Sequence, residues 1–180
     1  MNRRDLLLSL PLAAHTVSHP LRAAANSYSS AKPDFTLNLP AGQKISVSQF
    51  RGKVVVLEFF KTTCPHCQQS MPRIQKAYQE FGSKGFQPLA VAVDQYPAAV
   101  VAEFVKRYGI TFPTGWAEIE PICDFLEIKP QNFYVPTMVS FTRSGKVHAR
   151  HLGGESFFNM EEANLRNEIE FLLNQKGAAR

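Results

Sequence analysis

Apolar residues follow two different spacings over residues 33 to 180, and each spacing predicts one kind of element. Two mainly apolar runs, Val54 to Phe60 and Phe86 to Val93, are typical of strands that are buried on both faces, as in parallel sheets. Apolar residues that recur every three or four positions predict helices instead. Such helices are expected over residues 64–82, 98–108, 119–126 and 161–173.

Shorter alternating segments predict a β-hairpin at each end of this region. The turn residues Pro40-Ala41-Gly42 separate the first pair of segments, and Arg143-Ser144-Gly145-Lys146 separate the second. The four expected hairpin strands are residues 35–37, 45–47, 137–142 and 147–152. A short extended piece is expected at residues 112–114. The order of these elements implies an α/β fold in which a central mixed sheet is flanked by helices.

The N-terminal residues have the pattern of a secretory signal. Arg3 and Arg4 precede a short apolar stretch, and Ala23-Ala24-Ala25 supplies small residues for cleavage. The arginine pair fits either a twin-arginine signal or an ordinary basic leader. We therefore expect a signal peptide over 1–25, a flexible mature N-terminus over 26–32 and one domain over 33–180. The cleaved protein would be soluble and located in the periplasm or otherwise outside the cytoplasm.

Composition limits the classes of partner. The formal net charge of the 180 residues is +5, and it falls to +3 without residues 1–25, which carry three arginines and one aspartate. The remaining charge is small and dispersed, so a nucleic-acid partner is not expected. Export to an oxidising compartment draws attention to the three cysteines, because thiols there form or exchange disulfides.

Cys64-Pro65-His66-Cys67 lies where a buried strand ends and a helix begins. A CxxC at such a junction is typical of a thioredoxin-like redox motif. Cys64, at the helix N-terminus, is expected to be the attacking thiol, because the helix dipole stabilises a thiolate there. Cys67, one turn further, is expected to be the resolving thiol. A protonated His66 would add a positive charge beside the thiolate and make the disulfide more oxidising; an untuned surface histidine is the alternative.

Other uses of the cysteines find less support. A zinc site would require further paired ligands, and haem attachment would require histidine at position 68, where the chain has Gln68. Cys123 lies among apolar residues, which favours a small buried side chain over a reactive thiol. His148 and His151 are three apart on an expected strand, so we expect them to face opposite sides and to form no metal pair.

The chain resembles the TlpA/ResA-like thiol-disulfide oxidoreductases, which are related to the AhpC/TSA proteins. The resemblance spans roughly residues 33–153 and implies a thioredoxin-like fold with an N-terminal β-hairpin and a helical insertion. The segments that carry it are Asp34-Phe35-Thr36-Leu37, residues 52–60, Cys64-Pro65-His66-Cys67, Met71-Pro72, Tyr108-Gly109-Ile110, Phe112-Pro113-Thr114, Val135-Pro136-Thr137 and Ser144-Gly145-Lys146-Val147.

Two features depart from the usual pattern of this family. Thr63 stands where the family often has tryptophan, which removes an aromatic surface beside Cys64. The dipeptide Pro65-His66 is that of the strongly oxidising DsbA class. The scaffold thus resembles a family rich in reductases while the dipeptide resembles that of an oxidase, and the direction of the reaction stays open.

The resemblance also assigns roles to residues outside the CxxC motif. Glu58 matches the position of the buried acid of thioredoxin and is expected to relay a proton to or from Cys67; a solvated glutamate, or one paired with Lys61, is the alternative. Pro136 matches the cis-proline of thioredoxin folds, which places the backbone of Val135 beside Cys64. Pro65, Val135 and Pro136 are therefore expected to contact the client.

The resemblance implies an exported enzyme that exchanges the Cys64–Cys67 disulfide or dithiol with cysteines of client proteins. Reduction in cytochrome c maturation, with a membrane electron donor or acceptor, is the pathway it suggests. No cofactor is expected beyond this disulfide, and no metal. Two alternatives stay open: a peroxiredoxin-like thiol peroxidase, although Phe59 stands where the peroxiredoxin loop has proline, and a thioredoxin-fold module that handles copper.

Overall fold

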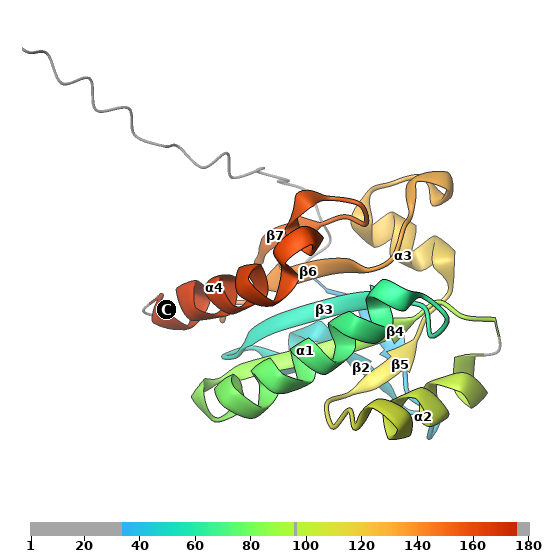
Figure 1. Cartoon of the computed structure of the whole chain (residues 1–180), viewed down its shortest axis with the longest axis horizontal. Coiled ribbons are helices and arrows are strands. Elements are labelled where there is room, and N and C mark those ends of the chain that lie inside the picture. Colours follow the sequence, from blue (N-terminus) through green and yellow to red (C-terminus); the bar gives the residue numbers. More distant parts are fainter. Residues whose placement is uncertain (1–33, 96, 176–180) are drawn as a thin grey trace, which may run out of the picture.

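The central sheet organises the structure. The computed structural model describes residues 34–95 and 97–175, so the expected signal peptide (1–25) and N-terminal segment (26–32) lie outside the described residues. Seven strands pair in the order β2-β1-β5-β4-β3-β6-β7 (Figure 1). Their bounds are β1 Thr36–Asn38, β2 Lys44–Ser46, β3 Val54–Phe60, β4 Phe86–Ala92, β5 Thr114–Trp116, β6 Thr137–Phe141 and β7 Val147–His151.

The sheet is mixed, as the order of elements predicts. Strand β3 pairs in parallel with β4, and β4 in parallel with β5. The two hairpins, β1–β2 and β6–β7, are antiparallel, and they join the sheet by antiparallel pairing of β1 with β5 and of β6 with β3. All seven residues of β3 and of β4 are buried, which explains why both strands are mainly apolar runs in the sequence.

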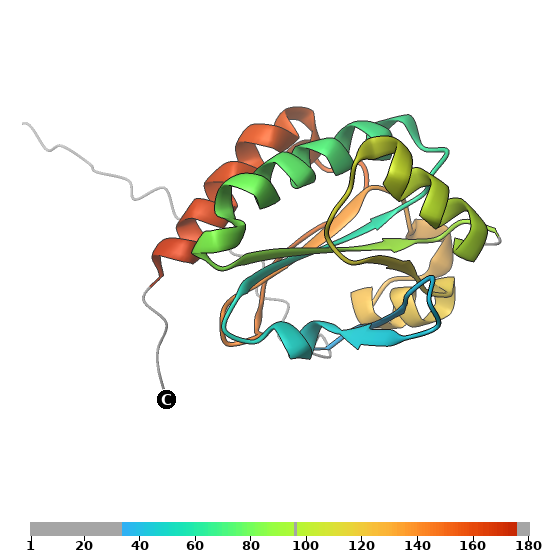
Figure 2. The ribbon, with the colours of Figure 1, turned by 90° about the horizontal axis from the view of Figure 1, so that it is seen from below.

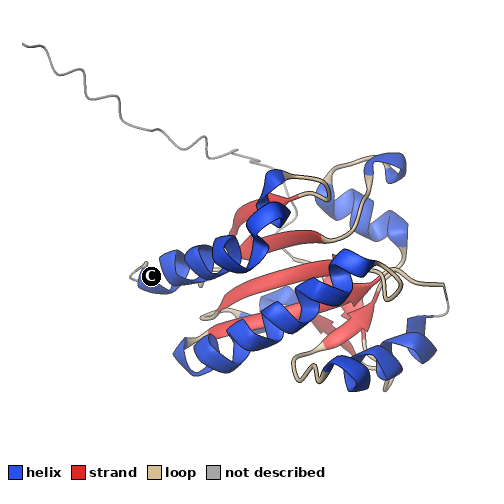
Figure 3. Ribbon diagram, in the orientation of Figure 1, coloured by secondary structure: helices blue, strands red, loops and turns tan. Residues whose placement is uncertain are grey.

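Helices cover both faces of the sheet (Figures 2 and 3). Helices α1, α2 and α4 share one apolar core, to which they contribute Met71, Phe104 and Ile169, among others. Helix α3 packs in a second core on the other face through Ile122 and Phe125. The helix bounds are α1 Pro65–Phe81, α2 Pro97–Tyr108, α3 Ile119–Leu126 and α4 Glu161–Asn174. No helix within residues 34–95 and 97–175 combines the length and hydropathy needed to cross a membrane.

Strand β5 is the element that the sequence pattern places least well. The extended piece was expected at residues 112–114, whereas β5 spans Thr114–Trp116. Three residues around a glycine show no period that could be recognised. A Cβ atom at Gly115 would overlap the carbonyl oxygen of Asn38, so the glycine allows β1 to lie directly against β5.

The expectation that His148 and His151 face opposite sides is wrong. The pairing of β6 with β7 shifts register between Ser140 and Phe141, so that His148 falls in a β-bulge. A bulge adds one residue to one strand and thereby changes which face the following side chains occupy. Both histidines contact α4: the ring of His148 lies 5.4 Å from that of Phe171, and His151 Nε2 lies 2.7 Å from Glu168 Oε2.

The packing of α4 against the sheet generates a stability prediction. Ile169 is fully buried in the core that α1, α2 and α4 share. Ile169→Ala should lower the free energy of unfolding by about 2 to 5 kcal/mol, because it removes buried methylene and methyl groups and leaves a cavity. Asn167→Ala, an exposed change on the same helix, should alter it by no more than about 0.5 kcal/mol. Urea denaturation measures both, and equal effects would contradict this packing.

Candidate active site

Cys64 lies at the N-cap of α1, immediately after the loop that leaves β3. Its backbone is extended, with φ −79° and ψ 118°, and Pro65 occupies the first turn of the helix. This conformation follows from the sequence, because a residue that precedes proline avoids the helical region and proline is well suited to the first helical position. The backbone N–H of Cys67 donates a hydrogen bond to Cys64 Sγ over 3.4 Å. The half-buried sulfur of Cys64 therefore accepts one of the free N–H groups of the helix N-terminus.

Asp94 fixes the loop that carries Cys64. Its carboxylate accepts the backbone N–H of Thr62 at 2.9 and 3.1 Å and the hydroxyl of the same residue at 2.6 Å. The side chain of Gln68, in the first turns of α1, donates to the carbonyl of Thr62 at 2.8 Å. Asp94 follows β4, and the carboxyl ends of the parallel strands β3 and β4 meet at one edge of the sheet. This strand order is the signal by which the sequence could have identified Asp94.

The loop that precedes β6 forms the other side of the site. The Val135–Pro136 peptide bond is cis, as the resemblance implied. The Cys64 thiol lies 3.8 Å from the carbonyl oxygen of Val135 and is oriented to donate to it. Thr137 holds the loop, since its hydroxyl donates to the carbonyl of Tyr134 at 2.7 Å and accepts the N–H of Gly153 at 3.0 Å. The backbone of Val135 thus borders the thiol that is nearer to solvent.

Glu58 is fully buried in the middle of β3. The hydroxyl of Ser70, on α1, lies 2.8 and 2.7 Å from the two carboxyl oxygens. Burial raises the pKa of Glu58 well above that of an ordinary glutamate, and the charge of Glu161 raises it further, against the opposing effect of the Ser70 hydrogen bond. The side chain is therefore the buried acid that the resemblance implied, not a solvated glutamate.

Cys67 is also fully buried, unlike Cys64. Burial raises the pKa of the Cys67 thiol, and so do its hydrogen bond with Cys64 and the nearby charge of Glu58, in that order of importance. The two thiols of the motif therefore occupy different environments. One is half-buried beside free N–H groups, and the other is enclosed beside an acid that disfavours a second negative charge.

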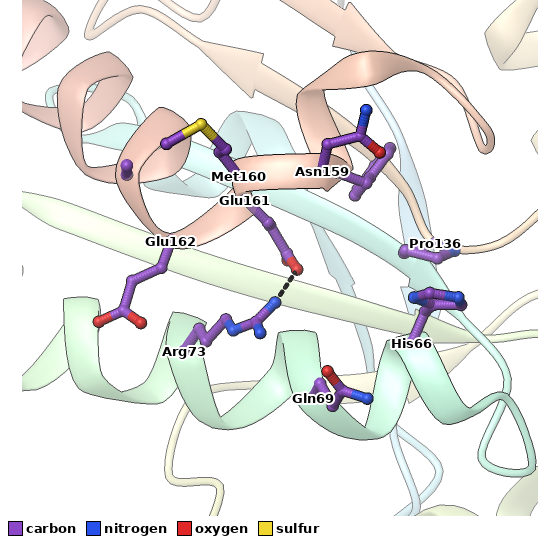
Figure 4. A pocket seen from close by; sticks show the side chains of 10 residues that line it. His66, Gln69, Arg73, Pro136, Asn159, Met160, Glu161 and Glu162 are labelled. Carbon is purple, nitrogen blue, oxygen red and sulfur yellow. Dashed lines mark hydrogen bonds and ion pairs between the residues drawn. The ribbon is translucent and has the colours of Figure 1, made fainter.

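A pocket of about 540 Å³ opens beside the CxxC motif, between α1 and the N-terminus of α4. His66 and Pro136 lie at one end and Glu162 at the other, with the ion pair between Arg73 and Glu161 in the middle (Figure 4). Arg73 Nη1 lies 2.9 Å from Glu161 Oε2. His66 is exposed, so its side chain borders both the pocket and the motif.

The other candidates from the sequence are Cys123 and possible metal ligands. Cys123 is only 3 % exposed and is one of the buried residues of α3, as expected. Within the part of the chain that the structure describes, no three His, Cys, Asp or Glu side chains are arranged to hold a metal ion. Ser70 and Glu161 were not identified from the sequence, because each belongs to the site only through packing between elements that are distant along the chain.

Comparisons with known proteins agree with this geometry. The family model described as "AhpC/TSA family" matches residues 29–150. The thiol-disulfide oxidoreductase ResA of Bacillus subtilis is 32% identical over 148 residues, which cover 81% of this chain and 80% of that protein. ResA of Halalkalibacterium halodurans is 32% identical over 129 residues, covering 72% and 70% respectively.

A solved structure extends the likeness to the fold. The thiol:disulfide interchange protein of the thioredoxin family from Chlorobium tepidum superimposes with a TM-score of 0.66 and 26% sequence identity. The match covers 80% of this chain and 96% of that one. The sheet order and the helices on both faces are accordingly those of a thioredoxin-like fold, as the sequence predicted.

The burial of Glu58 predicts how stability changes with pH. Glu58 ionises near pKa 4.3 in the unfolded chain, whereas burial raises its pKa well above that value in the folded protein. The wild type therefore loses stability as pH rises from the unfolded-state pKa to the folded-state pKa. Glu58→Gln keeps the shape and abolishes this loss. The stability advantage of Glu58→Gln over the wild type should therefore grow by about 1 to 3 kcal/mol as pH rises from about 4 to about 7. Guanidinium denaturation at both pH values measures the difference.

Glu162→Gln is the matched control for this prediction. Glu162 is exposed, and its hydrogen bond with Lys76 lowers the pKa of its carboxyl. The pKa of Glu162 is shifted in the opposite direction to that of Glu58. Relative to the wild type, Glu162→Gln should therefore lose a little stability, not gain it, as pH rises to neutrality. An advantage of Glu58→Gln that stays constant or shrinks with pH would show that Glu58 is not held neutral by the fold.

Proposed function

Because the chain belongs to the AhpC/TSA family and is a ResA-like thiol-disulfide oxidoreductase, we propose that Cys64 and Cys67 exchange a disulfide with cysteines of client proteins outside the cytoplasm. The observation that carries this proposal is the contrast between the two thiols. Cys64 is half-buried and receives a backbone N–H, while Cys67 is enclosed and faces Glu58. Such a contrast suits one thiol for attack and the other for resolution.

The first step is attack on the client. The Cys64 thiolate attacks one sulfur of a client disulfide, that S–S bond breaks, and the second client sulfur leaves as a thiolate that takes a proton from solvent. The product is a mixed disulfide between Cys64 and the client. The carbonyl of Val135, 3.8 Å from Cys64 Sγ, offers a hydrogen-bond acceptor to the extended chain on either side of the client cysteine.

The second step releases the client. Glu58 in its ionised form takes the proton of Cys67, which attacks Cys64 Sγ. The mixed disulfide then breaks, and the client sulfur leaves as a thiolate that takes a proton from solvent. The net result is a reduced client, with two thiols, and an oxidised Cys64–Cys67 disulfide. A carboxyl whose pKa is raised by burial suits this transfer, because it can both accept a proton and return it.

The same steps run in reverse when the protein oxidises a client. The direction depends on the reduction potential of the pair relative to that of the partner that regenerates it. We propose a membrane electron donor or acceptor for that regeneration, and cytochrome c maturation as the pathway, as the family resemblance implies. His66, in the first turn of α1, is the residue proposed to set the potential. The signal peptide over residues 1–25 would deliver the protein to its compartment.

The ResA relatives favour disulfide exchange over the two alternatives that the sequence left open. Both relatives are thiol-disulfide oxidoreductases by name, and a partner cysteine, Cys67, lies one helical turn from Cys64. A peroxidase would need only Cys64 as its oxidised centre. A copper-handling module would need further ligands beside the pair.

The division of labour predicts which variant traps clients. Cys67→Ser should accumulate mixed disulfides with client proteins, because Cys64 still attacks and nothing resolves the product. Cys64→Ser should accumulate none, since the buried Cys67 does not reach a client. Non-reducing electrophoresis of both variants, produced with export intact, measures the adducts. Equal trapping by the two variants would refute the assignment.

Glu58 should affect the second step and not the first. In Glu58→Gln the proton of Cys67 has no acceptor, so resolution of the mixed disulfide should slow by roughly tenfold to a hundredfold. Attack by Cys64 should change by less than about twofold, because the helix N-terminus, which serves that thiol, is intact. Stopped-flow kinetics with a peptide disulfide separate the two rates. Equal slowing of both steps would mean that the substitution disturbs the whole site.

A further inference from the structure

The pocket between α1 and α4 contains a buried acceptor that lacks a hydrogen bond. Glu161 is only 3 % exposed, and its Oε2 is paired with Arg73. Its second oxygen, Oε1, is buried without a hydrogen-bond partner among the described residues. Native structures rarely leave such an atom unpaired, because an unmade hydrogen bond to a charged group is costly. The atom belongs to a residue that lines the pocket, so a ligand there could supply the donor.

The position of the pocket indicates what kind of ligand reaches it. His66, two residues beyond Cys64, and Pro136, next to Val135, lie at one end of it (Figure 4). A client whose cysteine meets Cys64 must therefore run past the mouth of the pocket. An extended chain advances only about 3.3 Å per residue, so side chains close to the client cysteine are the ones that can enter.

Charge and shape favour a basic side chain. The guanidinium of Arg73 binds one oxygen of the buried Glu161 carboxylate and leaves Oε1 without a donor. An ammonium or guanidinium group in the pocket would supply the donor that Oε1 lacks, and a hydrogen bond between two charged groups is stronger than one from a neutral donor. The walls include Phe158, Met160 and Pro136, which suit the methylene stem of a lysine or an arginine.

We propose that this pocket selects clients that carry a lysine or arginine close to their reactive cysteine, with Glu161 Oε1 accepting the hydrogen bond of the basic group. The inference rests on the proposed function, and it names the substrate class of that same site. Glu161 acts on specificity and does not touch the reacting sulfurs.

Peptide disulfides with thionitrobenzoate test the proposal. The Cys64 thiolate attacks the peptide sulfur, the S–S bond breaks, and thionitrobenzoate leaves as a coloured thiolate, so its release reports attack alone. The peptides contain one cysteine and one variable residue, which is lysine, glutamine, leucine or glutamate and is moved along the flanking positions. At the position that fits, the lysine peptide should react roughly tenfold faster than the glutamate peptide and at least about threefold faster than the glutamine peptide.

Two glutamine variants show whether Glu161 causes the preference. In Glu161→Gln the lysine-to-glutamate ratio should fall to less than about twofold. Glu120→Gln removes the same charge from an exposed residue of α3, which packs on the other face of the sheet and does not line the pocket, and should keep the wild-type ratio. Circular dichroism confirms that each variant is folded. If Glu161→Gln does not fold, the ranking of the four peptides by the wild type still decides the proposal.

The outcomes separate this inference from the proposed function. No release from any peptide would refute the proposed function itself. Release at equal rates from all peptides would leave that function intact and overturn the pocket's role. A glutamine peptide as fast as the lysine peptide, or a lysine preference that survives in Glu161→Gln, would also overturn it.

Discussion

A carboxyl group is buried at the centre of the sheet, and the chemistry of the site depends on that constraint. Glu58 lies on β3 between Ala90 of β4 and Met138 of β6, where water does not reach it. Burying an ionised carboxylate is expensive, so the fold raises its pKa and keeps one hydroxyl, that of Ser70, against it. The same enclosed space holds Cys67, whose thiol is consequently hard to ionise without a proton acceptor at hand.

The outer part of the site depends on how four separate segments meet. Asp94 at the end of β4 holds Thr62, which sets the entry of Cys64 into α1, and the loop at Val135 closes the opposite side. Helix α4 then brings Glu161 against α1. Ion pairs fasten these two helices along their length, between Arg73 and Glu161, Lys76 and Glu162, and Arg166 and Glu80. The position of Glu161 matters for the acid as well, since its charge raises the pKa of Glu58.

The sequence predicted the elements well where a period or a motif extends over many residues. The buried runs of β3 and β4, the helices and both hairpins follow from apolar spacing, and the CxxC motif identifies the reacting thiols. The sequence placed the extended piece of β5 two residues too early, and it did not predict the bulge at His148, because neither feature has a period. Nor did it identify Asp94, Ser70 or Glu161, which become part of the site only when strands and helices pack. Glu58 was predicted through a family resemblance, since one acidic residue in an apolar run does not by itself show burial.

The central claim is that the fold holds Glu58 protonated well above the pH at which a glutamate normally ionises. NMR titration of the Glu58 side-chain carboxyl in the reduced protein, assigned by the loss of its signal in Glu58→Gln, measures this directly. The account predicts a pKa well above the value of about 4.3 for an unperturbed glutamate. A titration at or below that value would contradict it, because Glu58 would then be an ordinary carboxylate at neutral pH, unable to return a proton to Cys67.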